Sequence, residues 1–168
     1  MSKLDEITKT KWLREHLAYE RGMLAQAYGR LGHVTGVDVN FAIEVFWLHA
    51  RNLYRFLRPR KEDKSSVTAQ DYVPGYKARA VFRQIDRLGA FTFHNGTQRL
   101  EWEKVTTAET HRFVLWLNEH WLEWAEQLPQ PYAQSVDRQP LTVRRQTGHE
   151  SFTTTTSSHL TVVFFGSG

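Results

Sequence analysis

Residues 44–56 read EVFWLHARNLYRF, and this stretch decides the fold of the chain. Apolar side chains recur through it at helical spacing and predict a helix whose surface is mostly buried. Charged groups are seldom fully buried unless they are paired, so the polar residues of this helix need an explanation. We expect Glu44 and Arg51 to lie inside as part of an ion pair, or to face a pocket together with His49.

Four helices are predicted, and they account for most of the first 128 residues. They span about residues 4–33, 40–57, 76–88 and 107–128. Asp38 or Asn40 can cap the second helix, and Thr106 with Glu109 forms a capping box for the last. We therefore expect a mostly α domain, a four- to five-helix bundle, over residues 1–128.

Two segments are candidates for β structure. Asn95-Gly96 separates FTFH from TQRLEW, which is a hairpin signal, although an irregular turn fits the same residues. Residues 129–168 read first as a Pro- and Gln-containing linker and then as a Thr-rich tail. The run HLTVVFF in this tail is typical of a strand, which would have to pack on the domain or pair with another chain. The expected β content is a short hairpin or one C-terminal strand.

Composition limits the classes of function. The 168 residues include no cysteine, which excludes disulfides and thiolate metal sites. No run resembles a signal peptide or a membrane span, so we expect a cytoplasmic protein with no membrane partner. The net charge of +4 suits an acidic partner such as RNA, and also suits an ordinary basic protein. His16 and Glu20 lie one turn apart without a third ligand near them, so no metal and no cofactor are predicted.

Arg87 and His94, which the six residues LGAFTF separate, are the candidate catalytic pair. An arginine can hold a phosphate through paired N–H donors, and a histidine can move a proton near neutral pH. Together they suffice for RNA cleavage without a metal, in which the 2′-hydroxyl attacks its own phosphate. The alternative is a surface arginine at a helix end and an unrelated histidine in a turn.

Several tryptophans raise the question of base stacking. They are Trp102, Trp116, Trp121 and Trp124. Trp121 and Trp124 follow the apolar spacing of the last helix, so core packing is the preferred interpretation over stacking on nucleic-acid bases. A further alternative is a small-ligand cavity inside the bundle, lined by Trp47, Tyr54 and Trp121.

The polar residues resemble, in order and spacing, a pattern found in small uncharacterised bacterial helical proteins. The matching residues are Glu44, His49, Arg51, Asn52 and Leu53, followed by Arg87, His94 and Arg99. The element Arg, six residues, His is in turn similar to the signature of the HEPN superfamily. The resemblance covers about residues 4–128.

Members of the HEPN superfamily are small helical bundles, commonly dimers, and many are metal-independent ribonucleases of toxin–antitoxin or phage-defence systems. The resemblance implies that Arg87 and His94 form the catalytic pair and face their symmetry mates across a homodimer. It also implies that the remaining matched residues support the site or bind the substrate. These are Glu44, His49, Arg51, Asn52 and Arg99.

Two functions follow as expectations. The first is an RNA-directed, HEPN-like protein that cleaves RNA without a metal and has an antitoxin or another protein as partner. The second is a non-catalytic helical module that dimerises, in which Glu44, Arg51 and Arg55 form a structural ion-pair network. In the first case Arg87 and His94 reach one phosphate-sized space, and in the second they point apart.

Overall fold

The computed structural model describes residues 5–35, 37–60, 66–79, 81–82, 85, 107–146, 151–156 and 160–163. Within these ranges the chain is mostly helical, which confirms the predicted fold class. None of the described helices is both long enough and apolar enough to cross a membrane. The predicted hairpin around Asn95-Gly96 lies outside the described residues, and a count of four or five helices stays a prediction.

The N-terminal helix is one continuous helical run in three parts. These are α1 (Glu6–Trp12), a single π-helical segment η1 (Leu13–Leu17) and α2 (Ala18–Arg30). Asp5 caps it, because its Oδ1 accepts a hydrogen bond of 2.7 Å from the backbone N–H of Thr8. The same bond stabilises the ionised carboxylate and holds the pKa of Asp5 below its ordinary value. A helix predicted over about residues 4–33 is confirmed by this run.

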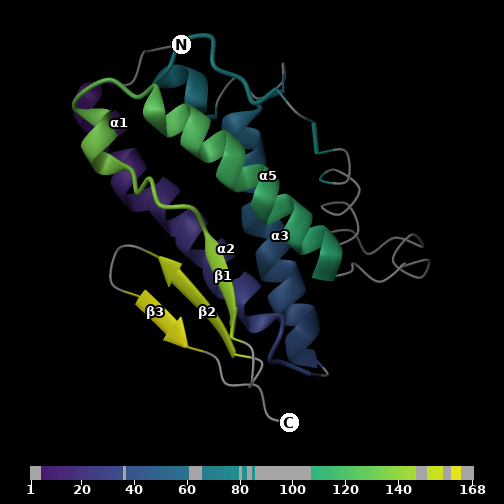
Figure 1. The fold of residues 1–168 in the computed structure, drawn as a ribbon. Helices are drawn as coiled ribbons and strands as arrows, with labels where there is room; N and C mark the ends of the chain where they lie inside the picture. Colours follow the sequence, from purple (N-terminus) through teal and green to yellow (C-terminus); the bar gives the residue numbers. More distant parts are fainter. Residues whose placement is uncertain are drawn as a thin grey trace.

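Two further long helices pack beside it (Figure 1). They are α3 (Val37–Leu57) and α5 (Thr107–Glu126). Their predicted ranges are close to the observed ones, but α3 begins earlier than predicted. Asp38 and Asn40 therefore lie inside its first turn, and the expectation that one of them is the N-cap is wrong. Thr106, the other predicted cap, lies outside the described residues.

The helices are joined by a core of aromatic rings. Phe46 and Trp47 of α3 are both fully buried, with ring centroids 4.9 Å apart. The ring of Phe113 on α5 lies 5.8 Å from that of Trp47. Near the C-terminal ends of α3 and α5, the rings of Phe56 and Trp124 meet edge to face with centroids 4.9 Å apart. Such pairs add stability beyond the area they bury, so they fix how α3 and α5 face each other.

The predicted helix over residues 76–88 is wrong for residues 76–79 and 81–82. This segment follows a short 3-10 turn, η2 (Ala69–Asp71), and runs beside α3 without regular helix. The backbone N–H of Ala78 donates to the carbonyl of Leu57 at 3.1 Å. Phe82 then packs against Trp47 and Phe113. Tertiary contacts with the end of α3 and with the aromatic core therefore prevail over the local helical spacing.

Residues 129–141 are packed on the helices, so their interpretation as a linker is wrong. The segment includes the 3-10 turn η4 (Tyr132–Ser135), and the side chains of Tyr132, Val136 and Leu141 are buried in the core. Asn118 of α5 exchanges two hydrogen bonds of 2.7 Å with the backbone of Leu141. Only tertiary contacts can order a sequence with so little local periodicity.

A buried arginine fixes this segment to α2. The guanidinium of Arg21 donates to Asp137 Oδ2 at 2.8 Å and to the carbonyl of Gln139. It also lies over the ring of Trp121, 5.1 Å from the centroid. Burial disfavours the charged form and lowers the pKa of Arg21, while the carboxylate of Asp137 opposes that shift.

The C-terminal backbone forms a three-stranded antiparallel sheet beside α2 (Figure 1). Its strands are β1 (Thr142–Gln146), β2 (Ser151–Thr156) and β3 (Leu160–Val163). Thr154 of β2 faces Val143 of β1 on one side and Val162 of β3 on the other. The sequence predicts one strand at HLTVVFF, which corresponds to β3, and does not predict the other two.

The aromatic core predicts that substitutions at two nearby positions of α5 change the free energy of unfolding by very different amounts. Phe113→Ala removes a fully buried ring and should lower the free energy of unfolding by about 3–5 kcal/mol. Leu115→Ala, two residues away with a side chain 55 % exposed, should change it by less than about 0.5 kcal/mol. Urea denaturation followed by circular dichroism measures both. Equal effects would contradict the assigned face of α5.

Candidate functional site

A pocket of about 360 Å³ opens between the N-terminal helix and α3, and we call it the α2–α3 pocket. Ten residues line it: Trp12, His16, Leu17, Glu20, Asn52, Leu53, Arg55, Phe56, Ser66 and Val67. Its volume is at the lower end of the range found for small-ligand sites, roughly 300–1,000 Å³. Apolar side chains and polar groups of both charges share the lining, which is typical of a binding site.

Glu20 is the centre of the polar group in this pocket. Its Oε2 accepts a hydrogen bond of 2.7 Å from His49 Nδ1 and another of 3.0 Å from Asn52 Nδ2. The imidazole of His49 is only 5 % exposed, and the ring of Tyr19 covers it edge-on with centroids 5.6 Å apart. A buried imidazole needs such an acceptor, so Glu20 and His49 fix each other's orientation across the two helices.

A histidine, an arginine and two aromatic rings complete the lining. His16 is exposed and lies in the π-helical segment η1, and Arg55 is half-buried on α3. The rings of Trp12 and Phe56 stack with centroids 5.4 Å apart and planes 22° apart. A π-helical turn widens a helix locally and often occurs beside a functional site. Here it places His16 at the edge of a pocket that contains the carboxylate of Glu20.

The pocket includes some of the predicted site residues and leaves others outside. Asn52 lines it, and His49 lies directly behind Glu20. Glu44 is half-buried and Arg51 is exposed. The expectation that Arg51 lies inside is therefore wrong, because Arg51 follows Leu48 by about one turn and shares its exposed side of α3. Thus Glu44 and Arg51 lie on a different face of α3 from the buried His49.

Three predicted residues lie outside the described part of the chain. They are Arg87, His94 and Arg99. Their place relative to the α2–α3 pocket, and the catalytic role that the resemblance implies for the first two, stay predictions.

Glu20 is the site residue that sequence reasoning missed. In the sequence it stood out only together with His16, as an incomplete pair of metal ligands. Among the described residues, no three histidine or acidic side chains lie close enough together to hold a metal ion. The signal that could have identified Glu20 was His49 itself, since a histidine on a buried helical face needs a hydrogen-bond partner from a neighbouring helix.

The tryptophans of α5 are core residues, as predicted. Trp116, Trp121 and Trp124 are all buried. The Trp124 indole N–H donates to the carbonyl of Ala69 at 3.3 Å, and that of Trp121 donates to the carbonyl of Asp137 at 2.8 Å. The indole N–H groups of Trp121 and Trp124 thus hold the segments that surround α5. Trp102, the fourth candidate for base stacking, lies outside the described residues.

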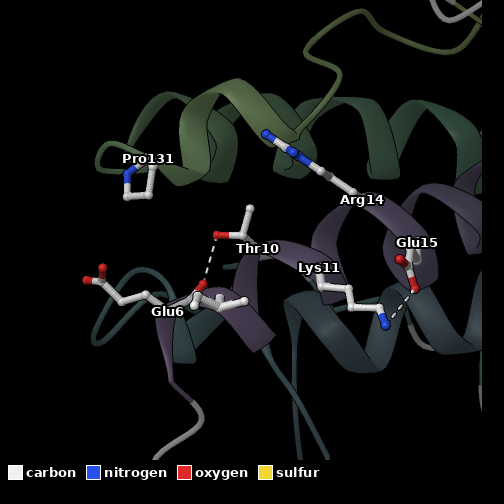
Figure 2. A pocket seen from close by; sticks show the side chains of 7 residues that line it. Glu6, Thr10, Lys11, Arg14, Glu15 and Pro131 are labelled. Carbon is white, nitrogen blue, oxygen red and sulfur yellow. Dashed lines mark hydrogen bonds and ion pairs between the residues drawn. The ribbon is translucent and has the colours of Figure 1, made fainter.

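A second hollow lies on the surface of the N-terminal helix, opposite Pro131 (Figure 2). Three of its charged side chains have partners within the chain. Lys11 pairs with Glu15 at 3.9 Å, and the guanidinium Nε of Arg14 donates to the hydroxyl of Ser135 at 3.1 Å. The hollow therefore marks where the C-terminal segment attaches to the helix, and it offers less chemistry than the α2–α3 pocket.

The Glu20 hydrogen bonds predict a measurable coupling. Glu20→Ala leaves buried His49 without its acceptor and should lower the free energy of unfolding by about 1–3 kcal/mol. Glu15→Ala, on the same helix with its carboxylate at the surface, should cost less than about 0.5 kcal/mol. A double-mutant cycle of Glu20→Ala with His49→Ala should give a coupling of about 1 kcal/mol, and strictly additive effects would contradict the pairing.

Comparison of the chain with protein-family models, with curated proteins and with solved structures gave no match. The similarity to the HEPN superfamily therefore rests on the motif residues read in the sequence. The chemistry of the pocket has to be argued from its own geometry.

Proposed function

We propose that this chain is an RNA-directed, HEPN-like protein that cleaves RNA without a metal ion. One observation carries the proposal, namely the α2–α3 pocket with its aromatic rings, the guanidinium of Arg55, the imidazole of His16 and the Glu20–His49 pair. Proteins recognise single-stranded RNA by stacking unpaired bases on aromatic rings and by contacting phosphates with cations. The net charge of +4 favours the approach of a polyanion.

In the proposed reaction His94 is the general base and Arg87 binds the phosphate. His94 takes the proton of the 2′-hydroxyl, whose oxygen attacks the adjacent phosphorus while the bond to the 5′-oxygen breaks. The leaving 5′-oxygen receives a proton from a water molecule, so the products are a 2′,3′-cyclic phosphate and a 5′-hydroxyl, and protonated His94 returns its proton to the solvent. Arg87 stabilises the charge that develops on the phosphate oxygens.

The described residues would hold the RNA in this scheme. His49 is buried, so its part is to position Glu20 in the pocket. Arg51 is exposed and can contact a phosphate at the surface, and Arg55 can do so at the pocket. Arg99 adds a further positive charge downstream of His94.

RNA cleavage in the presence of EDTA tests this function. The wild type should cut single-stranded RNA and leave 2′,3′-cyclic phosphate ends, and His94→Ala should reduce the rate about a hundredfold or more. His111→Ala removes an exposed histidine on α5 and should leave the rate unchanged. A folded wild-type protein that is inert on several RNA types would refute the ribonuclease proposal.

The outer face of α3 favours a second candidate function, a non-catalytic module that dimerises. Val37, Phe41 and Leu48 recur at helical spacing and are 82 %, 59 % and 38 % exposed. Exposed apolar side chains gathered on one helical face are typical of an interaction surface. Glu44 and Arg51 occupy the same face, at nearly equal distances on either side of Leu48.

This arrangement is complementary to itself. If two copies of α3 pack antiparallel with their twofold axis near Leu48, Glu44 of each copy comes opposite Arg51 of the other. The same contact would cover the exposed apolar residues of both copies. The proposed module is therefore a homodimer whose interface lies on this face.

Exchange of the two charges tests the proposed dimer. Glu44→Arg alone brings two arginines together across the axis, and Arg51→Glu alone brings two glutamates together, so each variant should dissociate about tenfold or more readily. A mixture of the two variants should form a heterodimer, because both cross-axis contacts are then attractive. Sedimentation velocity measures this.

Two substitutions serve as controls for the dimer. Leu48→Asp should also weaken it, whereas Leu115→Asp, at an exposed position of α5, should not. A wild type that stays monomeric at its highest soluble concentration would overturn the proposed interface.

A further inference from the structure

We propose that the α2–α3 pocket binds one guanine base and reads its Watson–Crick edge. The inference rests on the proposed RNA-directed function and names the part of the RNA that this pocket would select. It follows from the hydrogen-bonding capacity that remains on Glu20 and Asn52 after they have bound each other.

The hydrogen bonds among the three polar residues leave two acceptors at the pocket. Both bonds to Glu20 end on Oε2, so Oε1 receives no hydrogen bond from the described residues. Asn52 must turn its Nδ2 toward the carboxylate, because the amide oxygen cannot donate, and its Oδ1 is therefore the remaining acceptor. Both residues line the pocket, and the bond of 3.0 Å between them keeps their acceptors close together.

A pair of neighbouring acceptors requires a ligand edge with two neighbouring donors. Guanine is the standard base that has one, because its N1–H and its 2-amino group lie side by side. Adenine and cytosine each present one amino group beside a ring-nitrogen acceptor, and uracil presents one N–H between two carbonyl oxygens. Each would leave an acceptor of the pocket unpaired, which costs binding free energy.

The remaining lining suits a base that carries a phosphate. Trp12 is half-buried and stacks on the buried ring of Phe56, so the aromatic surface for a base comes from Trp12, and such stacking is worth about 1–3 kcal/mol per base. His16 and Arg55 also line the pocket, where the ring N–H of His16 and the guanidinium of Arg55 are donors suited to a phosphate. A guanidinium ligand such as arginine offers the same two donors as guanine but a much smaller planar surface for stacking on Trp12.

Isothermal titration calorimetry with free mononucleotides tests the inference. GMP should bind about tenfold or more tightly than IMP, which lacks the 2-amino group, and AMP should bind more weakly still. Glu20→Gln puts a donor where the acceptor was and should weaken GMP binding about tenfold or more. Glu15→Gln, one turn away on the outside of the same helix, should bind GMP like the wild type.

Circular dichroism establishes that each variant is folded. If Glu20→Gln does not fold, the comparison of GMP with IMP on the wild type decides the question by itself. Equal affinity for GMP and IMP, tighter binding of AMP or arginine than of GMP, or no binding of GMP would each overturn the inference.

The two proposals can fail separately. Cleavage of RNA without binding of GMP would overturn the guanine pocket and leave the ribonuclease proposal standing. Binding of GMP with the expected selectivity, by a protein that cleaves no RNA, would support the pocket and overturn the catalytic proposal.

Discussion

The α3 helix packs against α2 and, through its aromatic rings, against α5, and the remaining structure depends on this arrangement. A helix packed against two others can keep polar groups only on its outer face or where a neighbour supplies a partner. Glu44, Arg51 and Leu48 share the outer face. His49 has a partner on a neighbouring helix, because its Nδ1 lies 2.7 Å from Oε2 of Glu20 on α2.

The same packing produces the candidate site. The Glu20–His49 bond joins α2 to α3 beneath the pocket, and the π-helical segment brings His16 to its edge. Arg21, the next residue of α2 after Glu20, points to the other side and binds Asp137 and Gln139. Two adjacent residues of α2 thus have different contacts. Glu20 lines the α2–α3 pocket, and Arg21 binds the C-terminal segment.

The polarity of the pocket also has a physical explanation in this packing. Glu20 is held by two donors, so its carboxylate is oriented before any ligand arrives, which lowers the entropic cost of binding. The aromatic pair of Trp12 and Phe56 adds a rigid apolar surface. Preorganised acceptors beside aromatic rings favour a planar ligand with donors on its edge, which unites the proposed function with the guanine inference.

Local periodicity in the sequence determined the three long helices, the buried tryptophans of α5 and the mostly α fold, because a helix depends on contacts three and four residues apart. The helical pattern also placed His49 and Asn52 on α3. Only the tertiary structure decided that residues 76–79 and 81–82 lie beside α3 without regular helix and that residues 129–141 complete the core. It alone paired Glu20 with His49, because contacts between residues far apart in the chain leave no periodic pattern in the sequence.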